Sequence, residues 1–185
     1  MILLFSNQYF YPDDYQKSIF EIDYQKLWKN GIRYLFLDVD NTLASYAEME
    51  PGQKIIELFD EIKSLGMSMI LLSNNHSERV GRFAEILGVP HVPSSRKPLK
   101  AGFKKALKKF PEASKANVWV IGDQFMTDVL GAKRMGLSVT VVDAIDRDKE
   151  KWFTKINRMM ERHVLRRIAK ANPDLYSQLH LDEKR

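Results

Sequence analysis

Short apolar segments alternate with amphipathic segments between residues 33 and 143, and this alternation limits the folds open to the chain. Apolar runs predict strands over residues 33–39, 67–73, 117–123 and 137–143. Apolar positions spaced three and four apart predict helices over residues 51–66, 77–88, 98–110 and 126–136, with Ser77 as a helix cap. Strands that alternate with helices form parallel sheets covered on both faces. The sequence therefore predicts an α/β fold, a three-layer Rossmann-like parallel sheet with helices on both sides.

Three of the predicted strands end in polar residues that could carry chemistry. Asp38 and Asp40 follow the first strand, Ser73 and Asn74 follow the second, and Asp123 follows the third. Ligands bind beyond the carboxyl ends of the strands in open α/β sheets. If the strands are parallel, these side chains meet at one edge and form a single site.

The carboxylates at this edge indicate a hard cation and a phosphate ester. Asp38 and Asp40 are like charges on the same side of an extended chain, and a bound Mg²⁺ would relieve their repulsion. Asp123 could supply a further oxygen ligand, and Lys97 suits a phosphate. A carboxylate in line with phosphorus can act as a nucleophile, and a second carboxyl can exchange protons with the leaving group and with water. The simpler alternative is a strand-end turn with solvated acids.

Four motifs occur in one order along this part of the chain: DVDNTL from residue 38, LLSNN from residue 71, RKPLK from residue 96 and GDQFMTD from residue 122. In this order they resemble the motifs of haloacid-dehalogenase-like (HAD) phosphohydrolases. The opening segment, residues 9–46, resembles the class IIIA, YqeG-type subfamily. That subfamily is similar to the mitochondrial phosphatidylglycerophosphate phosphatases.

This resemblance implies a role for each matching residue. Asp38 would be the nucleophile and Asp40 the general acid and base, while Ser73 and Lys97 would hold the transferring phosphoryl group. Mg²⁺ would be coordinated by the Asp38 side chain, the main-chain carbonyl of Asp40 and Asp123. Supporting residues would be Asn41, Thr42, Asn74, Gly122 and Asp128, with Asp128 steadying Lys97 or the metal's water shell.

The resemblance and the short loops together indicate a substrate class. Residues 43–51 and 73–97 are too few for an inserted cap domain, so we expect an open site suited to a large substrate, a membrane surface or a partner. Our leading hypothesis is dephosphorylation of phosphatidylglycerophosphate to phosphatidylglycerol. Alternatives are a phosphatase for a nucleotide, a nucleic-acid end or a phosphoprotein, and a receiver-like signalling module that accepts phosphate on an Asp.

The basic character of the chain is concentrated near its C-terminal end. Residues 147–170 carry a net charge of +6, which leaves −1 for the rest of the chain. Residues 150–170 form an amphipathic pattern, and we expect domain boundaries of 1–146 for the HAD-like part and 147–185 for a basic helix and tail. The candidate contacts with an anionic membrane are Lys151, Lys155, Arg158, Arg162, Arg166 and Arg167.

Two other interpretations of this helix remain open. Its apolar stripe could pack on the same domain with the charges solvated, or it could bind nucleic acid, although no nucleic-acid motif accompanies it. The chain has no cysteine, no signal-peptide pattern and no apolar run near the ~20 residues that span a bilayer. We therefore expect a cytoplasmic protein, with peripheral attachment to the inner face of the membrane as an option.

Overall fold

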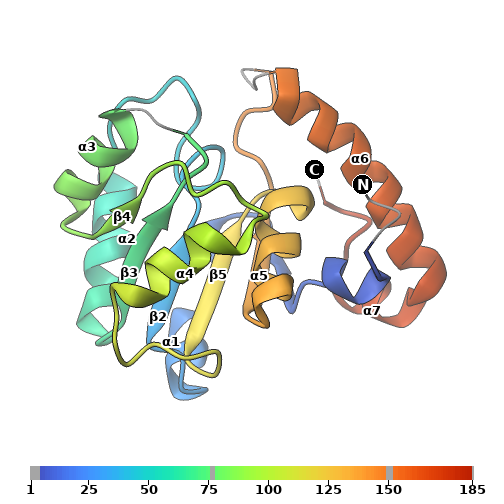
Figure 1. Ribbon diagram of the computed structural model, residues 1–185, viewed down its shortest axis with the longest axis horizontal. Helices are drawn as coiled ribbons and strands as arrows, with labels where there is room; N and C mark the ends of the chain where they lie inside the picture. Colours follow the sequence, from blue (N-terminus) through green and yellow to red (C-terminus); the bar gives the residue numbers. More distant parts are fainter. Residues whose placement is uncertain (1–4, 76–77, 149–151, 185) are drawn as a thin grey trace.

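The structure is a computed structural model that describes residues 5–75, 78–148 and 152–184. Its centre is a sheet of six parallel strands in the order β1-β6-β5-β2-β3-β4 (Figure 1). The strands are β1 (Asp14–Gln16), β2 (Tyr34–Leu37), β3 (Ser68–Leu72), β4 (His91–Val92), β5 (Val118–Gly122) and β6 (Ser138–Val142). The predicted α/β fold with a parallel sheet is confirmed.

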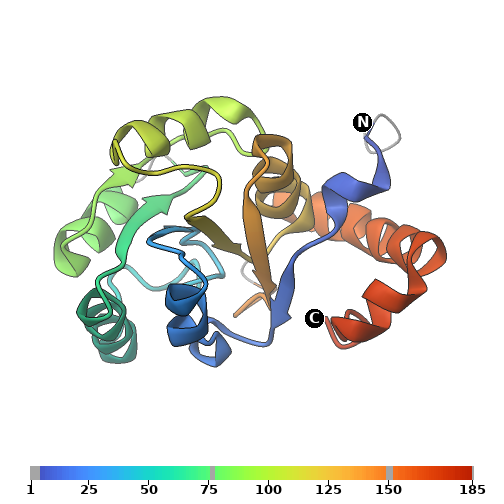
Figure 2. The same cartoon turned by 90° about the horizontal axis from the view of Figure 1, so that it is seen from below.

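Helices cover both faces of the sheet because the buried strands carry apolar side chains on both sides (Figure 2). The helices are α1 (Tyr24–Lys29), α2 (Gln53–Ser64), α3 (Glu78–Leu87), α4 (Lys100–Lys108), α5 (Leu130–Met135), α6 (Trp152–Ala171) and α7 (Pro173–Gln178). Shorter turns are the 3-10 helices η2 (Asn7–Phe10) and η3 (Ile19–Glu21) and the π-helix η4 (Phe125–Val129).

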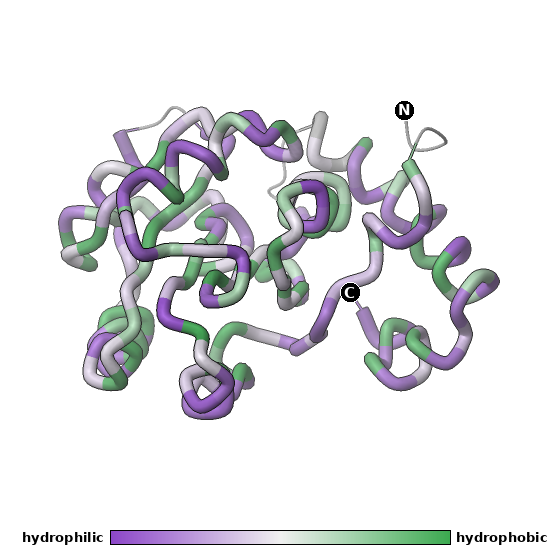
Figure 3. The backbone as a smooth tube through the Cα atoms, turned by 60° about the horizontal axis from the view of Figure 1, so that its bottom comes forward, coloured by the Kyte–Doolittle hydropathy of each residue, from purple (hydrophilic) through white to green (hydrophobic). Residues whose placement is uncertain are grey.

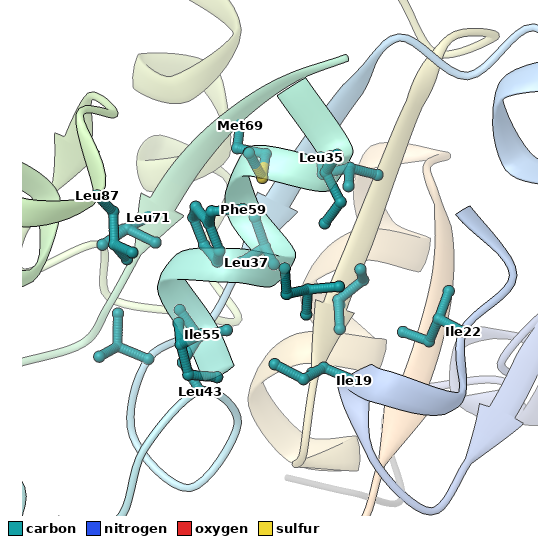
Figure 4. Close-up of a cluster of buried hydrophobic side chains, with 14 of the residues drawn as sticks. Ile19, Ile22, Leu35, Leu37, Leu43, Ile55, Phe59, Met69, Leu71 and Leu87 are labelled. Atoms are coloured by element: carbon teal, nitrogen blue, oxygen red, sulfur yellow. The ribbon is translucent and has the colours of Figure 1, made fainter. Parts of the chain in front are cut away.

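Successive strand residues divide between two hydrophobic clusters, as the alternation of side chains along a strand requires. Leu35 and Leu37 of β2 face α1, α2 and α3, where Phe59 is fully buried. Phe36, between them, faces α4 and α5 and packs in the second cluster. Figure 4 shows the first cluster, with side chains from α2 lying over those of β2 and β3. Because both faces of the sheet are packed in this way, the positions of the strand ends are fixed.

The structure adds elements that the sequence pattern did not indicate. β1 lies at the edge of the sheet beside β6, and residues 91–92, which had no clear pattern, form the short edge strand β4. The segment predicted as one helix over 126–136 begins one residue earlier as the π-helix η4 and continues as α5. Gly136 ends α5 with a left-handed backbone (φ 72°) that favours glycine. The predicted cap Ser77 lies outside the described residues.

The C-terminal helix α6 packs against the body of the molecule through one side only. Val164 and Ile168 are buried in the second cluster, whereas Ile156 and Met159 are exposed. Figure 3 shows hydrophobic and hydrophilic residues alternating along this helix. The interpretation in which the apolar stripe packs on the same chain therefore holds for Val164 and Ile168. In the part of the chain that the structure describes, no helix is long and apolar enough to cross a membrane.

Candidate active site

Three neighbouring strands bring the sequence-predicted residues to one edge of the sheet. β2 lies between β5 and β3, and all three run parallel. Asp38 directly follows β2, Ser73 follows β3 and Asp123 follows β5, so the three side chains meet beyond the strand ends. All three are buried.

Lys97 joins two carboxylates at the centre of this cluster. Its Nζ lies 2.5 Å from Asp38 Oδ1 and 2.7 Å from Asp128 Oδ1. Burial raises the pKa of Asp38 above its ordinary range; Lys97 opposes this, and the charges of Asp128 and Asp123 add to it. Burial alone would lower the pKa of Lys97, but the charges of Asp128 and Asp38 outweigh it and raise that pKa. Lys97 is therefore a permanent cation beside Asp38.

The loop after β2 is shaped by Asn41 and Thr42. Asn41 adopts a positive φ of 65°, a conformation that asparagine tolerates better than most residues, and its backbone N–H donates to Ala44 O at 2.8 Å. Thr42 Oγ1 lies 3.2 Å from Asp38 Oδ2 and 3.4 Å from Asp123 Oδ1, and its hydroxyl can donate to either carboxylate. The tight loop thus ties the strand ends of β2 and β5 together.

Asp40 is held by donors from the next strand and helix. Ser73 Oγ donates to Asp40 Oδ2 at 3.2 Å, and Asn75 Nδ2 donates to the same oxygen at 3.3 Å. Arg79 of α3 donates to Asp40 Oδ1 at 2.5 Å. The Arg79 side chain is buried because it lies one turn before Phe83 on the inner side of α3.

Two supporting residues affect the position of Lys97, Asn74 directly and Gly122 through Asp128. Asn74 Oδ1 accepts from the backbone N–H of Lys97 at 2.6 Å, and its Nδ2 donates to Lys97 O at 3.0 Å, so it clamps the loop that carries Lys97. Gly122 allows Asp128 to approach, because a Cβ at residue 122 would lie 2.4 Å from Asp128 Cγ. Both residues therefore position Lys97 through short-range contacts.

Arg158 of α6 reaches into the same cluster. Its guanidinium pairs with the Asp123 carboxylate and donates to Asp123 O at 3.0 Å, and Glu161 accepts from it at 2.9 Å. The membrane role expected for Arg158 is therefore corrected, since its side chain is buried and paired with an acid of the site. The signal in the sequence was its spacing from Thr154 and Glu161, which places all three on the inner side of the helix.

The other basic residues of the C-terminal segment have different positions. Arg162 and Arg166 are exposed. Arg167 is half-buried and donates to Phe5 O and to Asn7, so it ties α6 to the N-terminal segment. Lys151 and the side chain of Lys155 lie outside the described residues.

The acids of this site fit a hard divalent cation. Asp38, Asp123 and Asp128 are buried, and each offers an oxygen within 4.8 Å of the others. Together with Asp40 they make four carboxyl groups, which pair with three cations, so these seven groups carry a net charge of −1 when all four acids are ionised. The cations are Lys97, Arg79 and Arg158. Oxygen donors with an excess of negative charge are the environment that Mg²⁺ and similar ions prefer.

A pocket of about 190 Å³ opens over Asp38, Asp40 and Lys97. Its side wall includes Thr154 and Asn157 of α6, so the C-terminal helix forms part of the site. Buried charged side chains line the pocket, and the pocket opens to the outside, which suits a phosphate ester that enters with its phosphate first. We expected an open site because the loops are too short for a cap domain. In the structure, α6 borders this site on one side.

Comparisons with known proteins place this geometry in a family. A family model described as haloacid dehalogenase-like hydrolase matches residues 48–136. The protein named "Probable phosphatase YqeG" of Bacillus subtilis is 35% identical over 158 residues, which cover 85% of this chain and 91% of that protein.

Solved structures share the fold. The cobalt-bound deoxy-D-mannose-octulosonate 8-phosphate phosphatase YrbI of Haemophilus influenzae has a TM-score of 0.53 at 17% identity, covering 85% of this chain and 99% of that one. A hypothetical protein of Xanthomonas campestris has a TM-score of 0.52 at 18% identity, covering 70% of this chain and 74% of that one. The chain belongs to the haloacid dehalogenase-like hydrolases, in the family of the YqeG phosphatase.

Proposed function

We propose that this chain hydrolyses phosphate monoesters through a phosphorylated Asp38. The observation that carries the proposal is the placement of Asp38 at the floor of the pocket, 2.5 Å from the Lys97 cation and beside Asp123 and Asp128. Catalysis of phosphoryl transfer rests mainly on positioning and on neutralising charge. These groups supply both in a buried setting where electrostatic interactions are strong.

The chain's own residues account for the proton and bond changes. An Asp38 oxygen attacks phosphorus as the bond to the leaving oxygen breaks, and Asp40 gives that oxygen a proton. Asp40 then takes a proton from a water molecule that attacks phosphorus, which frees inorganic phosphate and restores the Asp38 carboxylate. Lys97 and Ser73 hold the phosphoryl oxygens, and Arg79 keeps the Asp40 carboxylate turned toward the pocket.

The metal assigned to this site is Mg²⁺. Asp38, Asp123 and the carbonyl of Asp40 would hold it, with Asp128 steadying Lys97. When bound, Mg²⁺ supplies positive charge that offsets the charge developing on the phosphoryl oxygens. Its chemical fit rests on the oxygen donors and the net negative charge of the cluster.

The substrate we propose is the lipid phosphatidylglycerophosphate. One line of support is the subfamily resemblance. The other is the exposed side of α6, the helix that also lines the pocket. This side carries two apolar and two basic residues, Ile156, Met159, Arg162 and Arg166. A helix with apolar and basic side chains on one exposed side suits the surface of an anionic membrane. Binding at that surface would bring a lipid head group to the pocket.

A substrate panel tests the reaction and the substrate together. We expect release of inorganic phosphate from phosphatidylglycerophosphate in mixed micelles with Mg²⁺, and none with EDTA. Hydrolysis of soluble phosphate esters alone would overturn the lipid assignment. Absence of Mg²⁺-dependent hydrolysis across the panel would overturn the phosphatase proposal.

The substitution Asp38→Asn tests the nucleophile. We expect phosphate release to fall by at least about 10³-fold, because an amide lacks the carboxylate charge needed for attack. The matched control is Asp60→Asn on the exposed side of α2, which should retain full activity. Activity of Asp38→Asn near that of the unchanged chain would remove Asp38 from this role, provided circular dichroism shows that both variants fold.

A further inference from the structure

The side wall of the catalytic pocket differs chemically from its floor. The ionic lining residues, Asp38, Asp40 and Lys97, we call the floor, and the other lining residues are uncharged. Four of these uncharged residues are polar and come from α6 or contact it, and we call them the wall: Tyr46, Gln124, Thr154 and Asn157. Each of them can both donate and accept hydrogen bonds. A neutral wall of this kind suits the hydroxyl groups of an alcohol better than a carboxylate or an amine.

The wall side chains form two pairs, each joining α6 to a loop of the sheet edge. Tyr46 Oη and Thr154 Oγ1 are 3.5 Å apart, and Asn157 Nδ2 donates to Gln124 Oε1 at 3.2 Å. Both distances are at the long end for hydrogen bonds of their type. Burial raises the pKa of Tyr46, which keeps its hydroxyl protonated.

α6 is fixed in position relative to the reacting carboxylate. Arg158, which immediately follows Asn157, pairs with the side chain of Asp123 and donates to its backbone carbonyl at 3.0 Å. Thr154 lies one turn before Arg158 and is buried. Asp123 also lies beside the hydroxyl of Thr42, which in turn contacts Asp38. The distance between the wall and the floor is therefore set by buried contacts.

We propose that Tyr46, Gln124, Thr154 and Asn157 form a subsite that binds the hydroxyl-bearing leaving alcohol of the substrate. The phosphoryl group lies on the ionic floor, and a hydroxyl on the carbon chain bonds to the wall in place of the two long side-chain pairs. The C-terminal helix thus contributes specificity, and its two residues lie outside the segment matched by the family model. This inference rests on the proposed phosphatase function.

The substrate class is a phosphate monoester of an alcohol that carries a further free hydroxyl. Free glycerol 3-phosphate and the head group of phosphatidylglycerophosphate share this chemistry. Propyl phosphate is the partner of glycerol 3-phosphate, and the lipid in which propane-1,3-diol replaces the head-group glycerol is the partner of phosphatidylglycerophosphate. Both partners keep the phosphate monoester and lack the free hydroxyl. For each pair, kcat/KM for the hydroxylated ester divided by kcat/KM for its partner measures what the subsite contributes. A preference in the soluble pair indicates a free phosphate ester as substrate, and a preference in the lipid pair indicates a lipid head group.

The test uses variants of the full chain that keep side-chain size but remove polarity: Asn157→Leu, Thr154→Val and Tyr46→Phe. We expect the unchanged protein to prefer the hydroxylated ester by at least about tenfold in one pair, and Asn157→Leu to reduce that preference by about fivefold or more, the size of one lost hydrogen bond. Asn157 and Tyr46 are half-buried, so their variants are less demanding on folding than that of the buried Thr154. His163→Ala, exposed on the same helix, should retain the preference.

The outcomes separate the two proposals. Hydrolysis of both members of each pair with no preference, or a preference that the three variants leave unchanged, overturns the subsite while the phosphatase function stands. Failure of the unchanged protein to hydrolyse any of the four esters with Mg²⁺ overturns both. A preference that falls in the three variants and persists in His163→Ala supports the subsite.

Discussion

Arg79 shows how one buried cation can organise a catalytic loop. Its guanidinium donates to Asp40 Oδ1 at 2.5 Å, to Ser45 O at 2.7 Å and to Glu48 O at 2.5 Å. It therefore holds the Asp40 carboxylate and two carbonyls of the following loop at once. The planar guanidinium suits three acceptors in different directions because its five N–H donors form a rigid fork.

Replacing Arg79 by Met should affect both stability and rate. Removing one partner of a buried ion pair leaves Asp40 uncompensated, so we expect the free energy of unfolding to fall by about 3–5 kcal/mol. We also expect kcat to fall more than KM changes, because Asp40 is misdirected for proton transfer. Urea denaturation and steady-state kinetics measure the two effects.

The control for Arg79 is Arg82→Met on the same helix. Arg82 is exposed and pairs with the exposed Glu50, so its loss should change stability by less than about 1 kcal/mol. Equal behaviour of the two variants would show that Arg79 does not position Asp40.

The Lys97–Asp38 pair predicts a dependence of activity on pH. Attack requires the Asp38 carboxylate, whose pKa is raised by burial and lowered by Lys97. Lys97→Met removes the lowering, so the acid limb of kcat/KM should move to higher pH as the overall rate falls. A pH profile of the variant measures this, with the exposed Lys100→Met as control. If the acid limb of kcat/KM stays in place or moves to lower pH in Lys97→Met, Lys97 does not lower the pKa of Asp38.

Some residues of the site could be predicted from the sequence, and others could not. Asp38, Ser73 and Asp123 stand at strand ends, so their convergence follows from the parallel sheet. The contacts of Arg79 and Arg158 depend on how α3 and α6 pack against that edge. Their charge suggested solvent, and only their position on the inner side of each helix indicated otherwise. The roles assigned to all of these residues remain predictions.

At the scale of elements, the junction of β5 with the π-helix η4 determines where Asp128 and Lys97 lie. The wider turn of η4 brings Asp128 back over the end of β5, where its Oδ2 accepts from Gln124 N at 3.2 Å. Asp128 then lies against Gly122 and supports Lys97. A periodicity argument detects a helix here but not its π geometry, because a single π turn of 5 residues is too short to change the apolar spacing of the segment.

The substitution Gly122→Ala tests this junction. A Cβ would lie 2.4 Å from Asp128 Cγ, so Asp128 must move and Lys97 with it. We expect a loss of about 1–3 kcal/mol in stability, typical of overpacking, and a reduced kcat. Gly52→Ala is the control, since a Cβ there would meet nothing within 4 Å. Full activity of Gly122→Ala would show that Asp128 does not need its present position.

β1 illustrates what local patterns cannot reveal. The segment Asp14–Gln16 has only three residues, two of them half-exposed, and lacks an apolar run. It becomes a strand because Tyr15 pairs with Val141 and Asp13 accepts from Val139 N at 2.7 Å. By contrast, β2, β3, β5 and β6 have buried apolar runs, and their positions followed from sequence alone.

At the scale of the whole molecule, α6 has two different sides. The inner side carries Arg158, Val164 and Ile168 into the body. The outer side exposes two apolar and two basic residues, Ile156, Met159, Arg162 and Arg166. Removing the helix would expose the buried apolar residues as well as delete the basic ones. Substitutions on the outer side therefore test membrane binding more cleanly than truncation.

The double substitution Arg162→Ser with Arg166→Ser should weaken binding to anionic vesicles. Each basic residue near such a surface contributes about 1 kcal/mol, so the loss of two corresponds to a roughly 30-fold weaker binding constant. The control, Lys26→Ser with Lys29→Ser on α1, removes the same charge elsewhere. Co-sedimentation with vesicles measures both. Equal binding of the two variants would leave α6 without a membrane role.

The pairing of β1 with β6 has a consequence for synthesis of the chain. β1 is an edge strand whose sheet partner begins at Ser138, and Asp14 and Thr140 are 126 residues apart. At about 5–20 residues per second, a ribosome needs roughly 6–25 s to make that interval. The first strand to leave the exit tunnel is thus among the last to find its partner, and the nascent N-terminal segment must wait unpaired while the central strands assemble.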